Sequence, residues 1–326
     1  MNHILVVGSI NMDLIVPSAR FPAPGETVLG GDLQIVSGGK GANQACAAAK
    51  LGAFTRLVAC VGDDLFGRRS MQSLQEAGVD TTLVGVSERF TGTALITVRP
   101  DGENSIVLSP GANSSLDART ALAALPSLRG GDIVLLQLEI PLETVEAVAR
   151  HAHDCGATVI LDPAPIQPLP PSLLACVDYL TPNQTEAAAL LGLEETALTD
   201  LAALEEVAAA LLAMGCRAVI LKLGAQGCFL SGPKGSAYIA AFPVTGVDTT
   251  AAGDVFNGAF AVALSEGATP QDAARFGNAA SAISVTRMGA QSSVPNRAQT
   301  DTFLASRTSA KVDSTHFERG LIVRDH

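Results

Sequence analysis

The feature that most constrains the fold of this chain is the alternation of short apolar strands with helical patterns along most of its length. Six apolar runs are typical of buried strands, and they lie at residues 4–8, 57–61, 133–137, 158–161, 178–181 and 218–223. Helical patterns separate them, for example at residues 65–77, 142–153 and 201–214. Strands joined through helices form parallel sheets with helices on both faces. The sequence therefore predicts an α/β fold with a central, mostly parallel sheet.

Two regions, at about residues 14–37 and 92–110, contain strand patterns with no helix between them. Strands are expected there at residues 14–16, 28–36, 93–99 and 105–109. These strands predict a small β-sheet lid beside the α/β body, and a lid can exclude water from a reaction. We interpret residues 1–306 as one domain and the polar, aperiodic residues 307–326 as a disordered tail.

The chain is acidic, with a formal net charge of −11 and a sequence pI near 4.9. Surfaces that bind nucleic acid or anionic membranes need clustered Lys and Arg, so we expect neither partner. No apolar stretch has the length of a membrane span, and the N-terminus lacks the basic region of a signal peptide. The six cysteines show no CxxC spacing and are expected to be reduced core residues. These features predict a cytoplasmic protein.

The segment at residues 247–264 runs from a polar loop into an apolar helix. The first turn of a helix leaves about four backbone N–H groups unpaired and carries a partial positive charge, so it can bind a phosphate. Three small residues leave these groups accessible, namely Ala251, Ala252 and Gly253. Asp254 is either an ordinary helix-start carboxylate or a base that takes a proton from a hydroxyl.

Two further expectations concern this segment. Asp248 and Thr250 lie just upstream and offer hard oxygen ligands of the type that a simple cation prefers. The helix start should lower the pKa of Asp254 below the value of about 3.9 for a free Asp. We expect Asp254 to be a lone carboxylate beside the phosphate-binding amides.

A second glycine-rich segment, at residues 38–45, also leads into a helix. Its glycines at positions 38, 39 and 41 permit positive φ angles and close approach of the backbone. Lys40 and Asn43 add polar groups. The spacing matches neither a Walker A loop nor GxGxxG, and no GxGxxG follows the first strand, which argues against a dehydrogenase. Taken alone, this segment is equally consistent with a tight turn.

Polar residues or glycines follow several predicted strands, and these are Asn11, Asp13, Glu139, Asn183 and Gly224. Ligands of open α/β sheets bind outside the carboxyl ends of the strands, so these residues predict one active-site rim. Structural alternatives remain open for several of them. Asn11 and Asp13 are also consistent with an Asx turn, Asn183 and Glu186 with a helix cap, and residues 222–227 with a hairpin turn.

With these segments identified, the chain resembles the PfkB family of carbohydrate kinases and, within it, the ribokinases. Residues 38–45 resemble the N-terminal signature of the family, and residues 248–258 resemble the C-terminal one. Shorter similar motifs lie at residues 8–13, 24–27, 162–165, 181–186 and 286–291, so the resemblance covers about residues 3–305. It implies a ribokinase-like three-layer sandwich and phosphorylation of the 5-hydroxyl of D-ribose by ATP.

The resemblance also implies roles by position. Ribose would be bound by Asn11, Asp13, Gly39, Lys40, Asn43, Glu139 and Asp254, with Asp254 as the base and Ala251, Ala252 and Gly253 as the anion hole. The nucleotide would be bound by Asn183, Glu186, Lys222, Leu223, Gly224, Ala225, Gln226, Gly227, Gly253 and Asn278. Potassium would be surrounded by Asp248, Thr250, Ser284, Arg287, Gly289 and Ser293, partly through carbonyl groups. Magnesium with the nucleotide, activating potassium and a homodimer formed through the lid are implied as well.

Several alternatives stay open at this point. Lys222 departs from the family pattern, in which Thr is common. The substrate could instead be 2-deoxyribose, another sugar or a nucleoside, although Asn11 and Asp13 favour a sugar with hydroxyls at both inner carbons. A non-catalytic sugar sensor on the same scaffold is an alternative of a different class. Gly289 could cap the helix expected at residues 270–287 rather than lie beside a cation.

Overall fold

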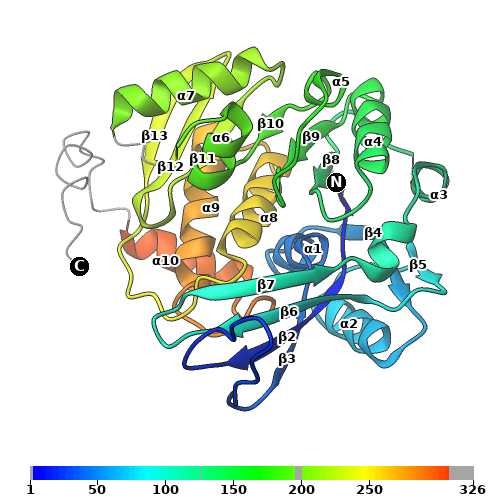
Figure 1. Ribbon diagram of the computed structural model, residues 1–326. Coiled ribbons are helices and arrows are strands. Elements are labelled where there is room, and N and C mark those ends of the chain that lie inside the picture. Colours follow the sequence, from blue (N-terminus) through cyan, green and yellow to red (C-terminus); the bar gives the residue numbers. More distant parts are fainter. Residues whose placement is uncertain (1–2, 126, 195–199, 308–326) are drawn as a thin grey trace.

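The computed structural model describes residues 3–125, 127–194 and 200–307. Within these residues, the central element is a nine-stranded sheet with the order β13-β12-β11-β10-β9-β8-β1-β4-β5 (Figure 1). The pairs from β11 to β5 are parallel, and β12 and β13 add an antiparallel edge. The strands are β1 (Ile4–Val7), β4 (Thr55–Gly62), β5 (Val84–Ser87), β8 (Ile133–Leu136), β9 (Thr158–Leu161), β10 (Tyr179–Leu180), β11 (Val219–Lys222), β12 (Gly227–Gly232) and β13 (Gly235–Ala240).

Helices cover both faces of this sheet, which confirms the predicted three-layer α/β architecture (Figure 1). One face carries α1 (Lys40–Lys50), α2 (Leu65–Glu76), α8 (Ala252–Ser265) and α9 (Pro270–Ser284), with α10 (Arg297–Arg307) packed on α9. The other face carries α3 (Ala118–Ala124), α4 (Leu142–Asp154), α5 (Pro171–Leu174), α6 (Gln184–Leu191) and α7 (Leu201–Ala213).

The central strand β1 shows why its sequence is apolar throughout. Its side chains alternate between the two faces, as the pleat of a strand requires. Ile4 and Val6 belong to the core that contains α1 and α8, whereas Leu5 and Val7 belong to the core that contains α4 and α7. Because both faces are covered by helices, every side chain of β1 is buried.

A separate four-stranded sheet with the order β3-β2-β6-β7 lies beside this body (Figure 1). Its strands are β2 (Asn11–Pro17), β3 (Gln34–Gly38), β6 (Gly92–Val98) and β7 (Asn104–Ser109). The β2–β6 pair is parallel, and the other two pairs are antiparallel. The expected small sheet is therefore present, and its strands come from the two regions of the chain that lack helices.

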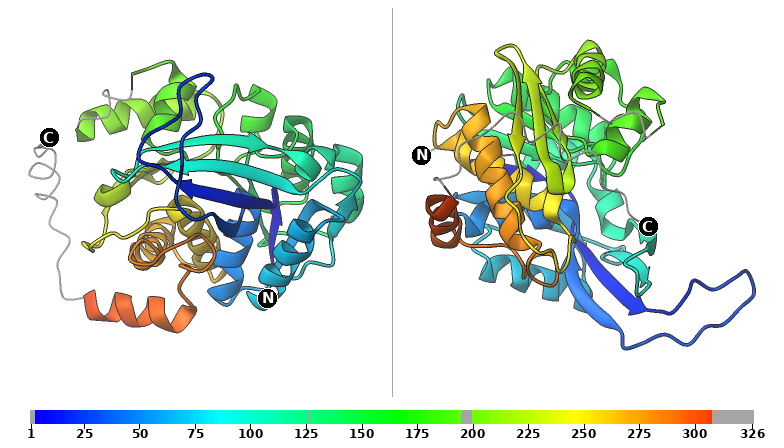
Figure 2. Two further views of the ribbon diagram at one scale, coloured as in Figure 1. Left: turned by 60° about the horizontal axis from the view of Figure 1, so that its bottom comes forward. Right: turned by 90° about the vertical axis from the view of Figure 1, so that its left-hand side faces the viewer.

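One predicted strand of this sheet is wrong in its bounds. Residues 28–33 form no strand, and β3 begins only at Gln34. The partner strand β2 ends at Pro17, which has no backbone N–H to extend the ladder. Residues 18–33 instead form the long connection that projects from the body in the right-hand view of Figure 2.

Two further expectations concern membrane spans and the C-terminal tail. In this part of the chain, no helix is both long and apolar enough to cross a membrane. The predicted disordered tail lies almost entirely at residues 308–326, outside the described residues.

Candidate active site

The two glycine-rich segments meet because α1 and α8 pack closely together. A Cβ atom added to Gly258 of α8 would lie 2.6 Å from the Cβ of Ala47 and 2.9 Å from the carbonyl oxygen of Gln44. Only glycine allows this close approach, which brings the first turns of both helices to the carboxyl ends of the parallel strands. The site is built at this junction.

Asp254 lies in the first turn of α8 and is 5% exposed. Its two carboxylate oxygens accept hydrogen bonds from α1: Asn43 Nδ2 donates to Oδ2 and Gln44 Nε2 donates to Oδ1, both at 3.0 Å. These bonds hold the carboxylate in one orientation. Asp254 is thus more than a helix-start residue that faces solvent.

The expectation that the helix start lowers the pKa of Asp254 is wrong. Burial raises its pKa to about 6, and the charge of Asp162 adds to the increase. The charge of Lys40 and the hydrogen bonds from Asn43 and Gln44 act in the opposite direction but do not outweigh burial. An Asp with this pKa is a better proton acceptor near neutral pH than an exposed Asp.

Asp254 is also not a lone carboxylate. Asp13 approaches from β2, and its pKa is raised to about 7 by burial and by the charges of Glu139 and Asp254. Lys40 lies near these carboxylates. Burial acts to lower the pKa of Lys40, but the charges of the nearby carboxylates, with Asp254 first, raise it. A Cβ atom on Gly38 would lie 2.3 Å from Asp13 Oδ2, so the glycine leaves room for this carboxylate.

Glu139 follows β8 and forms hydrogen bonds with two other segments of the chain. Its Oε2 atom accepts hydrogen bonds from the hydroxyl of Ser9, from Asn11 Nδ2 at 3.3 Å and from the backbone N–H of Lys40 at 3.0 Å. Asn11 is itself oriented by Asn113, whose Nδ2 donates to Asn11 Oδ1 at 2.7 Å. The predicted sugar residues of these segments therefore converge in one polar cluster.

The α8 start offers backbone donors. Ala251 has a φ of 59°, a left-handed conformation that is uncommon for a residue with a side chain and that turns the chain into the helix. The Ala252 N–H donates to the carbonyl oxygen of Thr249 at 3.2 Å. Within the described residues, the N–H groups of Gly253 and Asp254 donate no hydrogen bond. Those two groups remain available to an anion.

The residues predicted for the nucleotide lie farther along the same sheet edge. Asn183 and Glu186 form a capping box at the start of α6, so the structural alternative for this pair is realised. The turn at residues 223–227 joins β11 to β12, and the carbonyl oxygen of Gln226 accepts from the Tyr238 hydroxyl at 2.6 Å. Asn278 of α9 donates to the carbonyl oxygen of Ile239 at 3.0 Å. Ile239 lies at the end of β13 that pairs with the start of β12, next to the 223–227 turn.

The residues predicted to surround potassium lie on two loops that are joined by Asp248. Its Oδ2 atom accepts from the Gly289 N–H at 2.8 Å, and Oδ1 accepts from the backbone N–H of Thr250 at 2.9 Å. Burial acts to raise the pKa of Asp248, but these hydrogen bonds outweigh it and lower the pKa. Gly289 is not the cap of α9, because the helix already ends at Ser284 with Val285 as its cap.

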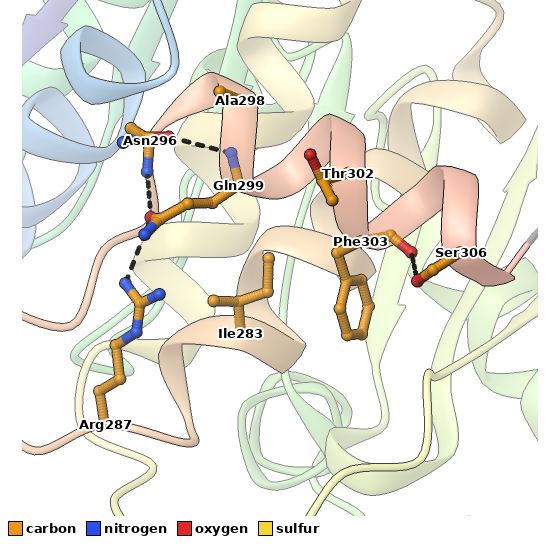
Figure 3. A pocket seen from close by; sticks show the side chains of 8 residues that line it. All are labelled: Ile283, Arg287, Asn296, Ala298, Gln299, Thr302, Phe303 and Ser306. Carbon is orange, nitrogen blue, oxygen red and sulfur yellow. Dashed lines mark hydrogen bonds between the residues drawn. The ribbon is translucent and has the colours of Figure 1, made fainter.

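Arg287 supports the second loop through its side chain. Its Nη1 atom lies 3.5 Å from the carbonyl oxygen of Ser293. The same atom lies 3.4 Å from Gln299 Oε1 (Figure 3). The surrounding groove between α9 and α10 has a volume of about 570 Å³ and contains no other residue that the sequence predicts for the site. The guanidinium group thus contacts Ser293 and α10, and because it is positively charged, only the backbone of Arg287 is suited to a cation.

Four polar residues of this region were given no individual role by the sequence. Gln44 Nε2 bridges Asp254 and Asp162, at 3.0 Å to each, and Asp162 in turn accepts from Lys222 Nζ at 2.9 Å. Gln291 reaches Asn43 Oδ1 at 3.4 Å. Gln44 and Asp162 lie within the recognised motifs and at a strand end, so a signal existed for them. Asn113 lies in a short 3-10 helix and has no such signal.

Comparisons with known proteins show which family the chain belongs to. A model of the pfkB family of carbohydrate kinases matches residues 1–297. A ribokinase from Haemophilus influenzae is 45% identical over 92% of this chain and 97% of its own. The structure of an Arabidopsis thaliana ribokinase complexed with ribose and ATP has 34% identity and a TM-score of 0.82, and the match covers 93% of this chain and 99% of the other.

A deoxyribokinase from Salmonella typhi is 34% identical over 93% of this chain and 98% of its own, which is a lower identity than that of the Haemophilus influenzae ribokinase. The three matched proteins align with this chain over nearly the full length of both sequences. The family model covers both glycine-rich segments. The chain therefore belongs to the PfkB family of carbohydrate kinases.

Proposed function

We propose that the protein transfers the terminal phosphoryl group of ATP to the 5-hydroxyl of D-ribose, giving D-ribose 5-phosphate and ADP. The observation that carries this proposal is the position of Asp254. This buried carboxylate, with a pKa of about 6, lies in the same helix turn as two free backbone N–H groups and faces the cluster around Asp13. The relatives from Haemophilus influenzae and Arabidopsis thaliana are ribokinases that match at least 92% of this chain, which supports ribose as the substrate.

The reaction needs one proton acceptor and one place for the charge of the moving phosphoryl group. The 5-hydroxyl oxygen forms a bond to the γ-phosphorus while the bond from that phosphorus to the bridging oxygen of ADP breaks. The hydroxyl proton passes to Asp254, and it can leave late because the transition state is loose. We assign the N–H groups of Gly253 and Asp254 at the start of α8 to the equatorial phosphoryl oxygens. The N–H group of Ala252, which was expected to belong to the anion hole, already donates to the carbonyl oxygen of Thr249.

We assign sugar binding to the polar cluster around Asp13 and Glu139 at the sheet edge. We assign Asp13 and Asn11 to the hydroxyls of the inner sugar carbons, because a carboxylate accepts from two hydroxyls and an amide both donates and accepts. Gly39, Lys40, Asn43 and Glu139 complete this proposed subsite. The residues that we assign to the nucleotide are Asn183, Glu186, the 222–227 turn and Asn278. The carboxylate of Glu186 would help to hold the magnesium ion that accompanies the nucleotide. Magnesium would neutralise phosphate charge there.

An ADP-release assay across a panel of sugars tests the proposed reaction. D-ribose is expected to give ADP at a higher kcat/KM than 2-deoxyribose, because the missing hydroxyl would leave a buried polar partner without a hydrogen bond. A preference for 2-deoxyribose or a nucleoside would assign another substrate. Ribose binding without any release of ADP would favour the non-catalytic sensor.

Potassium is expected to increase the rate of this reaction. We propose that Asp248, Thr250, Ser284, Gly289 and Ser293, with the backbone of Arg287, hold the ion. Their oxygen donors are of the type that binds such cations, and Asp248 already links both loops. Replacing sodium by potassium at constant ionic strength should raise kcat, and the variant Asp248→Asn should reduce the difference. Equal rates in the two salts would contradict the proposed ion site.

We also propose that the protein forms a homodimer through the small sheet and that it is located in the cytoplasm. Leu95 of β6 and Val107 of β7 are paired across the two strands and lie on the same face of the small sheet, where they are 50% and 65% exposed. This face therefore carries apolar side chains that a second copy can cover. All six cysteines are free, which is typical of proteins in reducing compartments. Sedimentation of the purified protein tests the dimer.

A further inference from the structure

Lys222 occupies an unusual position for a cation. It is the last residue of β11, and its side chain is only 12% exposed. Its Nζ atom donates to Asp162 Oδ1 at 2.9 Å. A Cβ atom built on Gly253 would lie 3.3 Å from the same Nζ atom. The ammonium group therefore lies against the first turn of α8, beside a backbone N–H group that has no acceptor among the described residues.

This position is electrostatically unfavourable unless an anion is nearby. The start of a helix carries a partial positive charge, which repels a cation and attracts an anion. In this structure, Asp162 provides the compensating negative charge. A phosphate group at the α8 start would attract Lys222 and the free N–H groups at the same time.

We propose that Lys222 binds the terminal phosphoryl group of the nucleoside triphosphate and exchanges its partner Asp162 for a phosphate oxygen when the nucleotide enters. The inference rests on the proposed function and deepens it, because it assigns to one residue the preference for a triphosphate over a diphosphate. A lysine suits this exchange, since its ammonium group is a point charge with three donors on a flexible stem.

Asp162 can release Lys222 without losing all its partners. Its other oxygen, Oδ2, accepts a hydrogen bond from Gln44 Nε2 at 3.0 Å, and that amide also holds Asp254. A buried carboxylate that keeps a hydrogen bond is much less unfavourable than an orphaned one. Lys222 and Lys40 both act to lower the pKa of the proposed nucleotide residue Glu186, and the charge of Lys222 has the larger effect.

Binding of ATP and ADP to the variant Lys222→Met tests this role. Titration calorimetry with EDTA and without sugar measures the direct contact between protein and nucleotide, free of magnesium. The variant is expected to bind ATP about 10- to 100-fold more weakly, the loss of one hydrogen bond to a charged group, and to change little in ADP affinity. Lys222→Arg keeps the charge and should retain most of the preference. Lys234→Met, at an exposed turn lysine, is the matched control.

Two outcomes would overturn the inference: an equal loss of affinity for both nucleotides, or no loss for either. A purely structural role, in which Lys222 only neutralises Asp162, predicts that Asp162→Asn restores ATP binding in the Lys222→Met protein; we expect no restoration. Thermal unfolding checks that each variant folds, and Lys222→Thr replaces the Met variant if that one does not. Native protein that releases no ADP with any sugar would instead refute the proposed function.

Discussion

Replacing Asp254 with Asn is expected to lower kcat with ribose by about 10²- to 10⁴-fold while ribose still binds. The amide keeps the size of the side chain but cannot accept the hydroxyl proton. Asn43 and Gln44 donate to the present carboxylate, so one of these contacts weakens while the surrounding polar cluster stays in place. The measurement is steady-state ADP release together with ribose affinity from calorimetry.

Asp117→Asn is the matched control for this variant. Asp117 is the N-cap of α3 and is exposed, and Asn is an equally good N-cap, so activity and stability should both stay close to those of the native protein. Turnover of Asp254→Asn within a few-fold of native would exclude Asp254 as the base.

The pKa of Asp254 also fixes the direction of its effect on stability. Its folded-state pKa of about 6 lies above the ordinary value of 3.8, so the native state binds more protons than the unfolded state between these values. The free energy of unfolding contributed by this group therefore falls as the pH rises from about 4 to about 6. Asp254→Asn removes that effect, and above pH 6 it should unfold at a temperature no lower than that of the native protein.

Replacing Asp13 with Ala is expected to raise the KM for ribose by about 10²- to 10⁴-fold, with a smaller change in kcat. The proposed contact is a carboxylate that accepts from two hydroxyls, and each such bond to a charged group contributes about 1.5–3 kcal/mol. Removing the carboxylate also relieves the repulsion from Glu139 and Asp254 that helps to raise the pKa of Asp13 to about 7. The variant should therefore remain folded.

The assay for Asp13→Ala is KM for ribose at saturating ATP, with KM for ATP at saturating ribose as a second readout. Only the first constant should change strongly. Asp32→Ala is the control, because Asp32 lies in the exposed connection between β2 and β3 and makes no predicted sugar contact. A KM for ribose that equals the native value would remove Asp13 from the sugar site.

The fold and the position of the site follow from local patterns. Apolar runs such as residues 4–7 and 133–136 are short, and helical patterns separate them, so a parallel sheet with buried faces was predictable. Parallel strands end at one edge, so residues that follow them in the sequence meet there. Glu139 was found in this way, whereas Asp254 was found from the polar loop that leads into an apolar helix. The strand expected at residues 28–36 was wrong at its start, since only residues 34–36 form part of β3, because the partner strand β2 ends at Pro17.

The sequence by itself determined the α/β architecture, the small sheet and the two glycine-rich helix starts, because each depends on the periodicity and conformational freedom of neighbouring residues. Only the tertiary structure decided the electrostatics of the site. The pKa of Asp254 is raised because burial removes water from its carboxylate, and no local pattern reports the burial of a single side chain by segments that are distant in sequence. The chain of contacts from Lys222 through Asp162 and Gln44 to Asp254 likewise joins residues far apart in sequence.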